Sequence, residues 1–352
     1  MTFESPHCQH NTFTIPFVYH FFFRGDFRKK SEANIRLFAY KGLSLREKVS
    51  YRHYMSDSFH TLLIGVDGGG TGCRVVIGTT ADGALARAEG GRANVASDPE
   101  LAIKNVIDTV EAAASKGMID LEQLKGATAH LGLAGVMTSQ DAGNVAAAVP
   151  YKNVTVTDDR PTALNGAFGG QDGFLLSVGT GTIAAAKIDG TYRSVDGWGF
   201  FVGDHASGSW LGHKCLRQVL LCHDEIAPHS DLTRAVFAKF NNDPNEIVAF
   251  SRSAKPGDYG VFAPEVVESA GVGDPVGKKL FEKGAGHLMR CLSALRFNAG
   301  DPLCLTGGVG PHYAKYLPDE ITAGLIDRRG NALDGAFALA RESVENSQEG
   351  LS

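Results

Sequence analysis

The feature that most constrains the fold is a strand, glycine-rich loop and strand arrangement that occurs twice. In the first copy an apolar strand at residues 61–66 runs into the loop Asp67-Gly68-Gly69-Gly70-Thr71-Gly72, and strand character resumes at 74–77. In the second copy the strand 174–178 leads through Gly179-Thr180-Gly181-Thr182 into the strand 183–187. Glycine lets a backbone approach a ligand closely because it has no Cβ. The repetition therefore predicts two similar lobes that each offer backbone N–H groups to a polyphosphate.

Both glycine loops are predicted to be hairpins, since a turn follows each second strand, at Ala81-Asp82-Gly83 and at Asp189-Gly190. P-loops and Rossmann loops instead open a helix, and the P-loop lysine is missing here. Taken alone, the first copy is equally compatible with a tight hairpin that binds nothing. A third glycine-rich turn, Thr306-Gly307-Gly308-Val309, follows an apolar strand and leads into helix-like sequence. A nucleotide base and ribose would lie against this turn.

The composition is that of a packed globular protein. The 352 residues suffice for two domains, and 43% of them are hydrophobic while 21% are charged. A net charge of −5 without a sustained Lys/Arg run argues against a nucleic-acid partner. The six cysteines include no C-x-x-C pair, which favours free thiols in a reducing compartment. No run of about 18 apolar residues is present, so we expect a soluble, cytoplasmic protein without a membrane partner.

Residues 1–54 differ from the rest of the chain. They are rich in Phe and Tyr without helical or strand periodicity, and basic clusters follow at 28–30 and 46–48. Pro16, His20 and Arg24 interrupt the only candidate for a secretory signal. Met55 stands shortly before the first clear strand. We therefore expect residues 1–55 to be an extension that is disordered or not part of the native chain, with a genuine targeting segment as the alternative.

The order and spacing of the three glycine-rich turns resemble the actin, hexokinase and heat-shock chaperone ATPase superfamily. In it, 67–72 and 179–182 would be the two phosphate loops and 306–310 the adenosine loop. Further segments look like its bacterial glucosamine kinase and N-acetylglucosamine kinase branch, within the benzoyl-CoA reductase activator-type ATPases. These segments are DGGGTGCR (67–74), GGRANV (90–95), HLGLAGV (130–136), GWGFFVGDHASGSWLG (197–212), PGDYGVFAPEV (256–266) and NALDGAFALA (331–340). The resemblance covers about 61 to 345.

This resemblance implies an α/β, two-lobed actin-like ATPase (ribonuclease H-like) fold with a cleft between the lobes. Lobe one would comprise 56–168 together with 331–349, and lobe two would span 169–330. The implied activity is ATP- and Mg²⁺-dependent phosphorylation of an amino sugar, at the 6-hydroxyl, with glucosamine favoured over N-acetylglucosamine. A homodimer is compatible with it. The alternatives are an ATP-driven activator of 2-hydroxyacyl-CoA dehydratase, for which no matching cysteine loop is present, and a non-catalytic sugar sensor.

Phosphoryl transfer requires carboxylates at the cleft, for the metal ion and for the attacking hydroxyl. Asp67, at the end of the first strand, is the expected outer ligand of Mg²⁺, with a turn-capping role as the alternative. Asp158 and Asp159 follow the strand 153–157 and open a helix. The resemblance places the catalytic base at Asp159, counted back from Gly166, while helix capping is the alternative for either acid.

For the sugar, the resemblance points to Asn94, Trp198 and Asp204, together with Asp159. An aromatic face beside a bidentate acceptor suits a pyranose, whose CH face is apolar and whose rim carries hydroxyls. Asn94 is alternatively a left-handed loop residue, and Trp198 alternatively a core residue. His205 stands where the branch usually has Glu or Gln, which leaves the fine specificity open.

Three helices complete the expected architecture. Ser97-Asp98-Pro99-Glu100 reads as a capping box that opens an amphipathic helix at 101–116. A long helix should run from Pro275 to about Phe297, and a last helix at about 331–345 should pack back on the first lobe.

Overall fold

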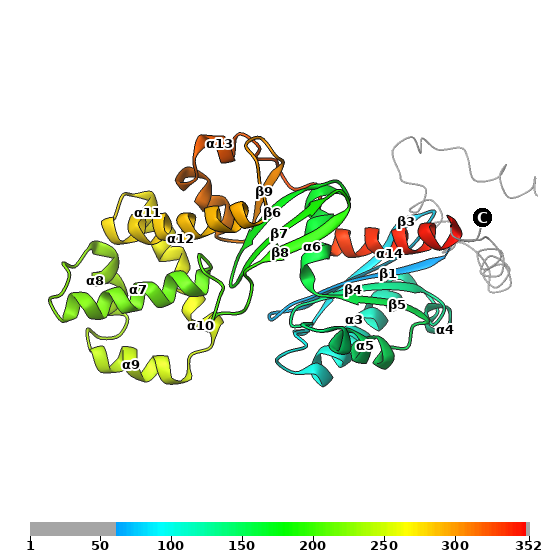
Figure 1. Cartoon of the computed structure of the whole chain (residues 1–352). Coiled ribbons are helices and arrows are strands. Elements are labelled where there is room, and N and C mark those ends of the chain that lie inside the picture. The colour runs from blue at the N-terminus through cyan, green and yellow to red at the C-terminus, as the bar shows by residue number, and fades with distance from the viewer. Residues whose placement is uncertain (1–60, 350–352) are drawn as a thin grey trace, which may run out of the picture. The chain divides into compact units, whose positions relative to one another are not determined.

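The computed structural model describes residues 61–349 (Figure 1). The expectations for residues 1–55 lie outside the described residues. From His60 onward the chain forms one compact unit that contains two β-sheets. The first sheet has the strand order β3-β2-β1-β4-β5, with β1 antiparallel to β2 and parallel to β4, and β4 parallel to β5. Its strands are β1 (Leu62–Gly68), β2 (Cys73–Thr79), β3 (Gly83–Gly90), β4 (Thr128–Leu133) and β5 (Asn153–Thr157).

Helices cover both faces of the first sheet because successive residues of a strand point to opposite sides. Ile64 and Val66 of β1 belong to a buried cluster that includes Val106 of α3. Between them, Gly65 lies against the backbone of Phe337 in α14, so close that a Cβ would be 2.7 Å from its nitrogen. The helices of this part are α3 (Pro99–Gly117), α4 (Leu121–Leu124), α5 (Ser139–Ala148), α6 (Asp159–Phe168) and α14 (Ala332–Glu349).

The second sheet has the order β8-β7-β6-β9, in which β6 pairs antiparallel with β7 and parallel with β9. Its strands are β6 (Gly173–Val178), β7 (Thr182–Ile188), β8 (Thr191–Val195) and β9 (Leu303–Thr306). The largest apolar cluster joins this sheet to its helices. These are α7 (Gly208–His223), α8 (Asp231–Ala238), α9 (Pro244–Ser253), α10 (Pro256–Gly260), α11 (Ala263–Gly271), α12 (Pro275–Ala294), the 3₁₀ helix η1 (Gly310–Tyr316) and α13 (Asp319–Thr322).

Helix α6 packs against both sheets. Leu164 and Phe168 share a buried cluster with Leu175 of β6. On another side, α6 packs closely against the start of α14. A Cβ on Gly166 of α6 would lie 2.0 Å from the carbonyl oxygen of Asn331, the residue that precedes α14. Helix α6 is therefore held by contacts to both halves of the described chain.

Most expected elements are present, and the differences are local. Both hairpins have the predicted strands and turns, and α14 packs on β1 and β4 as expected for the last helix. The capping box at Ser97 is wrong: Asp98 is the N-cap, and its Oδ1 accepts from the Leu101 amide at 3.0 Å. Proline at the first helical position shifts the cap by one residue because its fixed φ suits that position. The long helix α12 ends at Ala294, and the third turn opens into a 3₁₀ helix.

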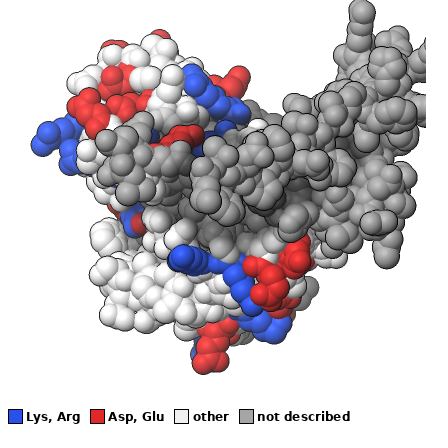
Figure 2. Space-filling model, turned by 90° about the vertical axis from the view of Figure 1, so that its right-hand side faces the viewer, with Lys and Arg blue, Asp and Glu red and all other residues white. Residues whose placement is uncertain are grey.

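The described residues carry charges of both signs, free thiols and no membrane-spanning helix. On the face of the molecule drawn in Figure 2, acidic and basic side chains are interspersed over the part that grey atoms do not cover. The five cysteines of the described part are free thiols, all buried. Within residues 61–349, no helix has both the length and the apolar character needed to cross a membrane.

Candidate active site

The candidate site begins at the carboxyl edge of the first sheet. β1, β4 and β5 run parallel, and their register aligns Asp67 with Gly132 and Gly132 with Thr157. Parallel strands present their carboxyl ends at one edge, where ligands bind in open α/β sheets. Asp67 and the Asp158-Asp159 pair therefore lie at the same edge, and β4 lies between β1 and β5.

The two adjacent acids that follow β5 have different environments. Asp158 is the N-cap of α6, and its Oδ1 accepts from the Arg160 amide at 2.9 Å. The same carboxylate accepts from the Arg160 guanidinium, at 2.7 Å from Nε and 3.1 Å from Nη2. Arg160 Nη1 also donates to Ser194 Oγ on β8 at 2.9 Å. Asp158 is thus committed to capping and ion pairing, a role that our alternative for this residue anticipated.

Asp159 occupies the first turn of α6 and is half-buried. Among the residues that the structure describes, its carboxylate bonds only to its own backbone amide. Burial, and next the charge of Asp158, raise the pKa of Asp159 to about 6, and the charge of Asp67 adds a smaller effect in the same direction. The charge of Arg160 acts in the opposite direction, although Arg160 forms its ion pair with Asp158. A carboxylate with a pKa near neutrality and no ion pair of its own among the described residues is suited to accept a proton.

Asp67 is paired with a cation that we did not single out from the sequence. Its Oδ2 accepts from Arg74 Nη2, and the two residues are opposite each other in the β1–β2 register. The Asp67 side chain is only 13% exposed. Oxygen ligands from this edge, chiefly Asp67, fit Mg²⁺, which prefers carboxylate, phosphate and water oxygens.

The first glycine loop has open space where a phosphate would lie. Ideal Cβ atoms on Gly69 and Gly70 would have no neighbour closer than 3.9 Å, and neither residue has a positive φ. Nothing in the described chain therefore requires glycine at these two positions. In that same part of the chain, the amides of Gly70 and Thr71 make no hydrogen bond. Gly68 is different, since a Cβ there would overlap Leu133.

The second loop has the same character. Gly179 has open space at its Cβ position, and the amides of Thr180 and Gly181 have no partner among residues 61–349. Gly208, the first residue of α7, donates its amide to the Gly179 carbonyl at 2.7 Å, which fixes the loop at a helix N-terminus. Thr182 is buried, and its hydroxyl donates to the His205 carbonyl at 2.7 Å, so this side chain supports the loop.

A cavity of about 610 Å³ connects the second loop with the third glycine turn. Its volume lies in the range that binds small molecules and cofactors. Gly307 has φ +80°, and a Cβ there would lie 2.3 Å from the Val178 carbonyl oxygen, so this glycine is needed for the close approach of the turn to β6. The lining includes Gly179, Thr180, Gly208, Gly308, Val309 and His312.

Asn94 lies beside the first loop. The amide of Ala93 donates to Gly69 O at 2.9 Å, and the amide of Val95 donates to Ala134 O at 2.9 Å. Asn94 Oδ1 accepts from the Ser97 amide at 3.0 Å, whereas its Nδ2 has no partner in the described part of the chain. Its φ is not positive, which contradicts the left-handed alternative. The side-chain NH₂ remains available to donate to a ligand.

The segment after β8 carries the remaining residues that the sequence predicts to bind the sugar. Trp198 is 65% exposed, so the alternative of a core tryptophan is wrong. Asp204 has φ +52° and accepts from the amides of Thr182 and Gly199, and burial raises the pKa of its carboxyl. Its Oδ2 would lie 2.9 Å from a Cβ on Gly181, so Asp204 adjoins the second loop. His205 is exposed.

The two glycine hairpins have loop amides without a partner in the described residues, and an acidic strand edge and a cavity accompany them. This arrangement is that of an ATPase with the two-lobed actin-like fold. The chain belongs to the BadF/BadG/BcrA/BcrD ATPase family, whose model matches residues 64–326.

The relatives align with this chain over nearly their whole length. The glucosamine kinase GspK of Vibrio cholerae is 30% identical over 285 residues, which are 80% of this chain and 97% of the relative. An N-acetyl-D-glucosamine kinase of Dictyostelium discoideum is 28% identical over 304 residues, 81% of this chain and 91% of that protein. A crystal structure from Chromobacterium violaceum, provisionally described as an N-acetylglucosamine kinase, has a TM-score of 0.74 at 32% identity and covers 80% and 99% of the two chains.

The open Cβ positions predict how the loops respond to substitution. Gly69→Val and Gly179→Val should raise KM for ATP, because overpacking against phosphate costs about 1–3 kcal/mol, or roughly 5-fold to 150-fold. The melting temperature should stay nearly unchanged, since no described protein atom is displaced. Steady-state kinetics and thermal melts measure both quantities.

The matched control is Gly143→Val, on an exposed position of α5 that also has no neighbour within 4 Å. Gly181→Val is unsuitable, because its side chain would collide with Asp204. Unchanged KM for ATP in both loop variants would disprove the phosphate assignment.

Proposed function

We propose that this chain is an ATP-dependent kinase that phosphorylates an amino sugar, with the 6-hydroxyl of glucosamine as the preferred acceptor and N-acetylglucosamine next. The observation that carries the proposal is Asp159, a carboxylate left without a cation partner among the described residues while the neighbouring Asp158 is bound by Arg160. The kinase names of relatives matched over most of their length support the same activity class.

In the proposed reaction Asp159 accepts the proton of the attacking sugar hydroxyl. The sugar oxygen forms a bond to the γ-phosphorus of ATP as the bond to the β,γ-bridging oxygen breaks, and ADP leaves. The free amides of Gly70 and Thr71, and of Thr180 and Gly181, would hold the phosphates. Mg²⁺, held by Asp67, would neutralise phosphate charge when bound. We assign the adenosine to the cavity at Gly308.

Arg160 has a positioning role in this proposal. Its guanidinium partly neutralises Asp158 and so limits repulsion between the adjacent carboxylates. Its contact with Ser194 connects the start of α6 to β8, and hence to the segment that carries Trp198. The base and part of the sugar surface would then be held in a fixed relation.

The proposed preference for glucosamine rests on charge. Asp159 and Asp204 would both present carboxylates to the sugar, whereas Asp158 is already ion-paired with Arg160. The ammonium group of glucosamine is cationic, whereas an acetamido group is neutral. Asn94 Nδ2 would donate to a ring hydroxyl, and Trp198 would face the apolar side of the ring.

We also infer lobe boundaries, compartment and partners. Residues 56–168 with 331–349 would form lobe one and 169–330 lobe two, because α14 packs on the first sheet. The free thiols of the described residues support a reducing, cytoplasmic location, and the substrate would be a small sugar rather than a nucleic acid.

A substrate panel tests the function. With Mg-ATP, kcat/KM should be highest for glucosamine, lower for N-acetylglucosamine and lowest for glucose, and NMR of the product should place the phosphate on the 6-hydroxyl. ATP hydrolysis that no sugar stimulates would instead support an ATPase that activates another enzyme. A preference for a neutral hexose would refute the charge argument.

The pH dependence should follow Asp159. Because only the carboxylate accepts a proton, kcat/KM for N-acetylglucosamine, which has no ionisable amine, should be constant above about pH 7 and fall as the pH drops through about 6. Asp158→Asn keeps a good helix cap but removes a charge that raises the pKa of Asp159, so the acidic limb should move to lower pH.

Measuring wild type and Asp158→Asn with the same sugar cancels the ionisation of substrate and nucleotide. A limb that stays in place, or that moves to higher pH in Asp158→Asn, would contradict the assignment.

A further inference from the structure

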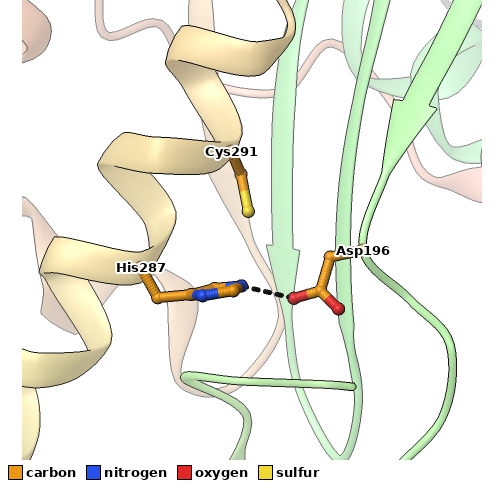
Figure 3. A group of neighbouring side chains, drawn as sticks. All are labelled: Asp196, His287 and Cys291. Atoms are coloured by element: carbon orange, nitrogen blue, oxygen red, sulfur yellow. Dashed lines mark hydrogen bonds and ion pairs between the residues drawn. The ribbon is translucent and has the colours of Figure 1, made fainter. Parts of the chain in front are cut away.

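A second group of reactive side chains lies in the second half of the chain, outside the residues assigned to the reaction. Asp196 follows β8, while His287 and Cys291 lie on α12 (Figure 3). One ligand atom from each residue lies within 4.8 Å of those of the other two. His287 Nε2 and Asp196 Oδ2 are 2.5 Å apart. The group therefore brings together nitrogen, oxygen and sulfur donors.

The local structure explains how these donors meet. His287 and Cys291 are four residues apart, which places both side chains on one face of α12. Asp196 has φ +60°, a left-handed conformation that costs energy for a residue other than glycine. Its side chain is 8% exposed, that of His287 is 19% exposed, and Cys291 is buried. Cys291 is too enclosed to act as a nucleophile on a substrate, whereas a buried thiolate is a good metal ligand.

We propose that Asp196, His287 and Cys291 bind a divalent transition-metal ion of the zinc class, with water in the fourth position. Tetrahedral zinc with bond lengths of about 2.0–2.3 Å places its ligands roughly 3.3–3.8 Å apart. The three donor atoms now lie within 4.8 Å of one another, and on metal binding the His287–Asp196 hydrogen bond would be replaced by bonds from both residues to the ion. The thiolate and imidazole select zinc-like ions over Mg²⁺ and Ca²⁺, which prefer oxygen alone.

Two neighbouring side chains, Arg290 and His205, contact His287 without being assigned as ligands. Arg290 Nη2 lies 3.4 Å from His287 Nδ1, but Arg290 is exposed and can turn into solvent. The His205 ring stacks on that of His287, with centroids 4.5 Å apart and an interplanar angle of 23°. A stacked ring lies outside the plane in which His287 Nε2 binds a metal, so His205 is not assigned as a ligand.

The competing interpretation is a metal-free ion pair. Hydrogen bonding to Asp196, and next to Cys291, raises the pKa of His287 to about 9, so a protonated imidazole can hold the carboxylate without a metal. The two interpretations differ in the role of Cys291, which is essential for a metal site and dispensable for an ion pair.

A bound ion would connect two elements of the second half. It would attach the segment 196–206, which carries Trp198 and Asp204, to α12. Asp204 and Ala206 also have positive φ, so the segment is strained at several points. If the proposed function holds, metal loading should lower KM for the sugar by ordering this segment.

Metal binding is tested on the full chain without reference to activity. Metal-stripped protein is dialysed against Zn²⁺ and its bound metal is measured, and Co²⁺ is used to detect a thiolate-to-metal charge-transfer band. Wild type should bind one Zn²⁺ more than Cys291→Ser, His287→Gln or Asp196→Asn. The cobalt band should vanish in Cys291→Ser. Since residues 1–60 contain His7, Cys8 and His10, the difference between proteins is the readout.

Cys222→Ser is the matched control, because Cys222 is 4% exposed and Cys291 5%, and both lie on helices. It should keep the metal, as should His205→Ala. Should Cys291→Ser fail to fold, Asp196→Asn retains the side-chain shape and should still weaken Zn²⁺ binding at least about 10-fold. Equal Zn²⁺ binding by wild type and the ligand variants would overturn the site.

Sugar KM with and without Zn²⁺ is measured separately. Loss of kinase activity in every protein would refute the proposed function and leave the metal result standing. Kinase activity with equal metal content in all variants would refute only the metal site.

Discussion

The register of β1, β4 and β5 is the constraint on which the candidate site depends. A slip of one residue would turn every side chain of a strand to the opposite face and separate Asp67 from the acids after β5. Gly132 lies between them, and a Cβ there would overlap Thr162 in α6. Glycine on β4 therefore lets the first turn of α6 lie against the strand. Packing in the middle of the sheet thus decides how close the carboxylates come.

Given that register, Arg160 separates the roles of two adjacent acids. Cap and guanidinium contacts engage Asp158, while Asp159 is half-buried and has a raised pKa. Burying a carboxylate without a partner destabilises its charged form, and this cost yields a group able to accept a proton near neutral pH. The contacts of α6 with β6 and α14 supply the rigidity that holds such a residue in place.

Local sequence signals were sufficient for the hairpins, the acidic edge and the long helices, because glycine turns and periodicity depend on neighbouring residues. The Asp67–Arg74 pair could have been predicted from the sequence, because the loop of a hairpin fixes the register of its two strands. The remaining features of the site depend on tertiary packing, which local sequence signals do not report. The exposure of Trp198 depends on the fold around it, and the Asp196–His287 contact joins residues 91 positions apart. The shift of the α3 cap to Asp98 shows that even local boundaries depend on competition between adjacent capping residues.

The central claim is that Asp159, and not Asp158, takes the proton of the sugar hydroxyl. Single-turnover rates of Asp159→Asn and Asp158→Asn, with ATP and sugar saturating at about pH 7.5, test it most directly. Asp159→Asn should slow phosphoryl transfer by about 10²–10⁴-fold while both substrates still bind, and Asp158→Asn should cost less than about 10-fold. The opposite ranking, with Asp158→Asn inactive and Asp159→Asn nearly silent, would contradict the claim.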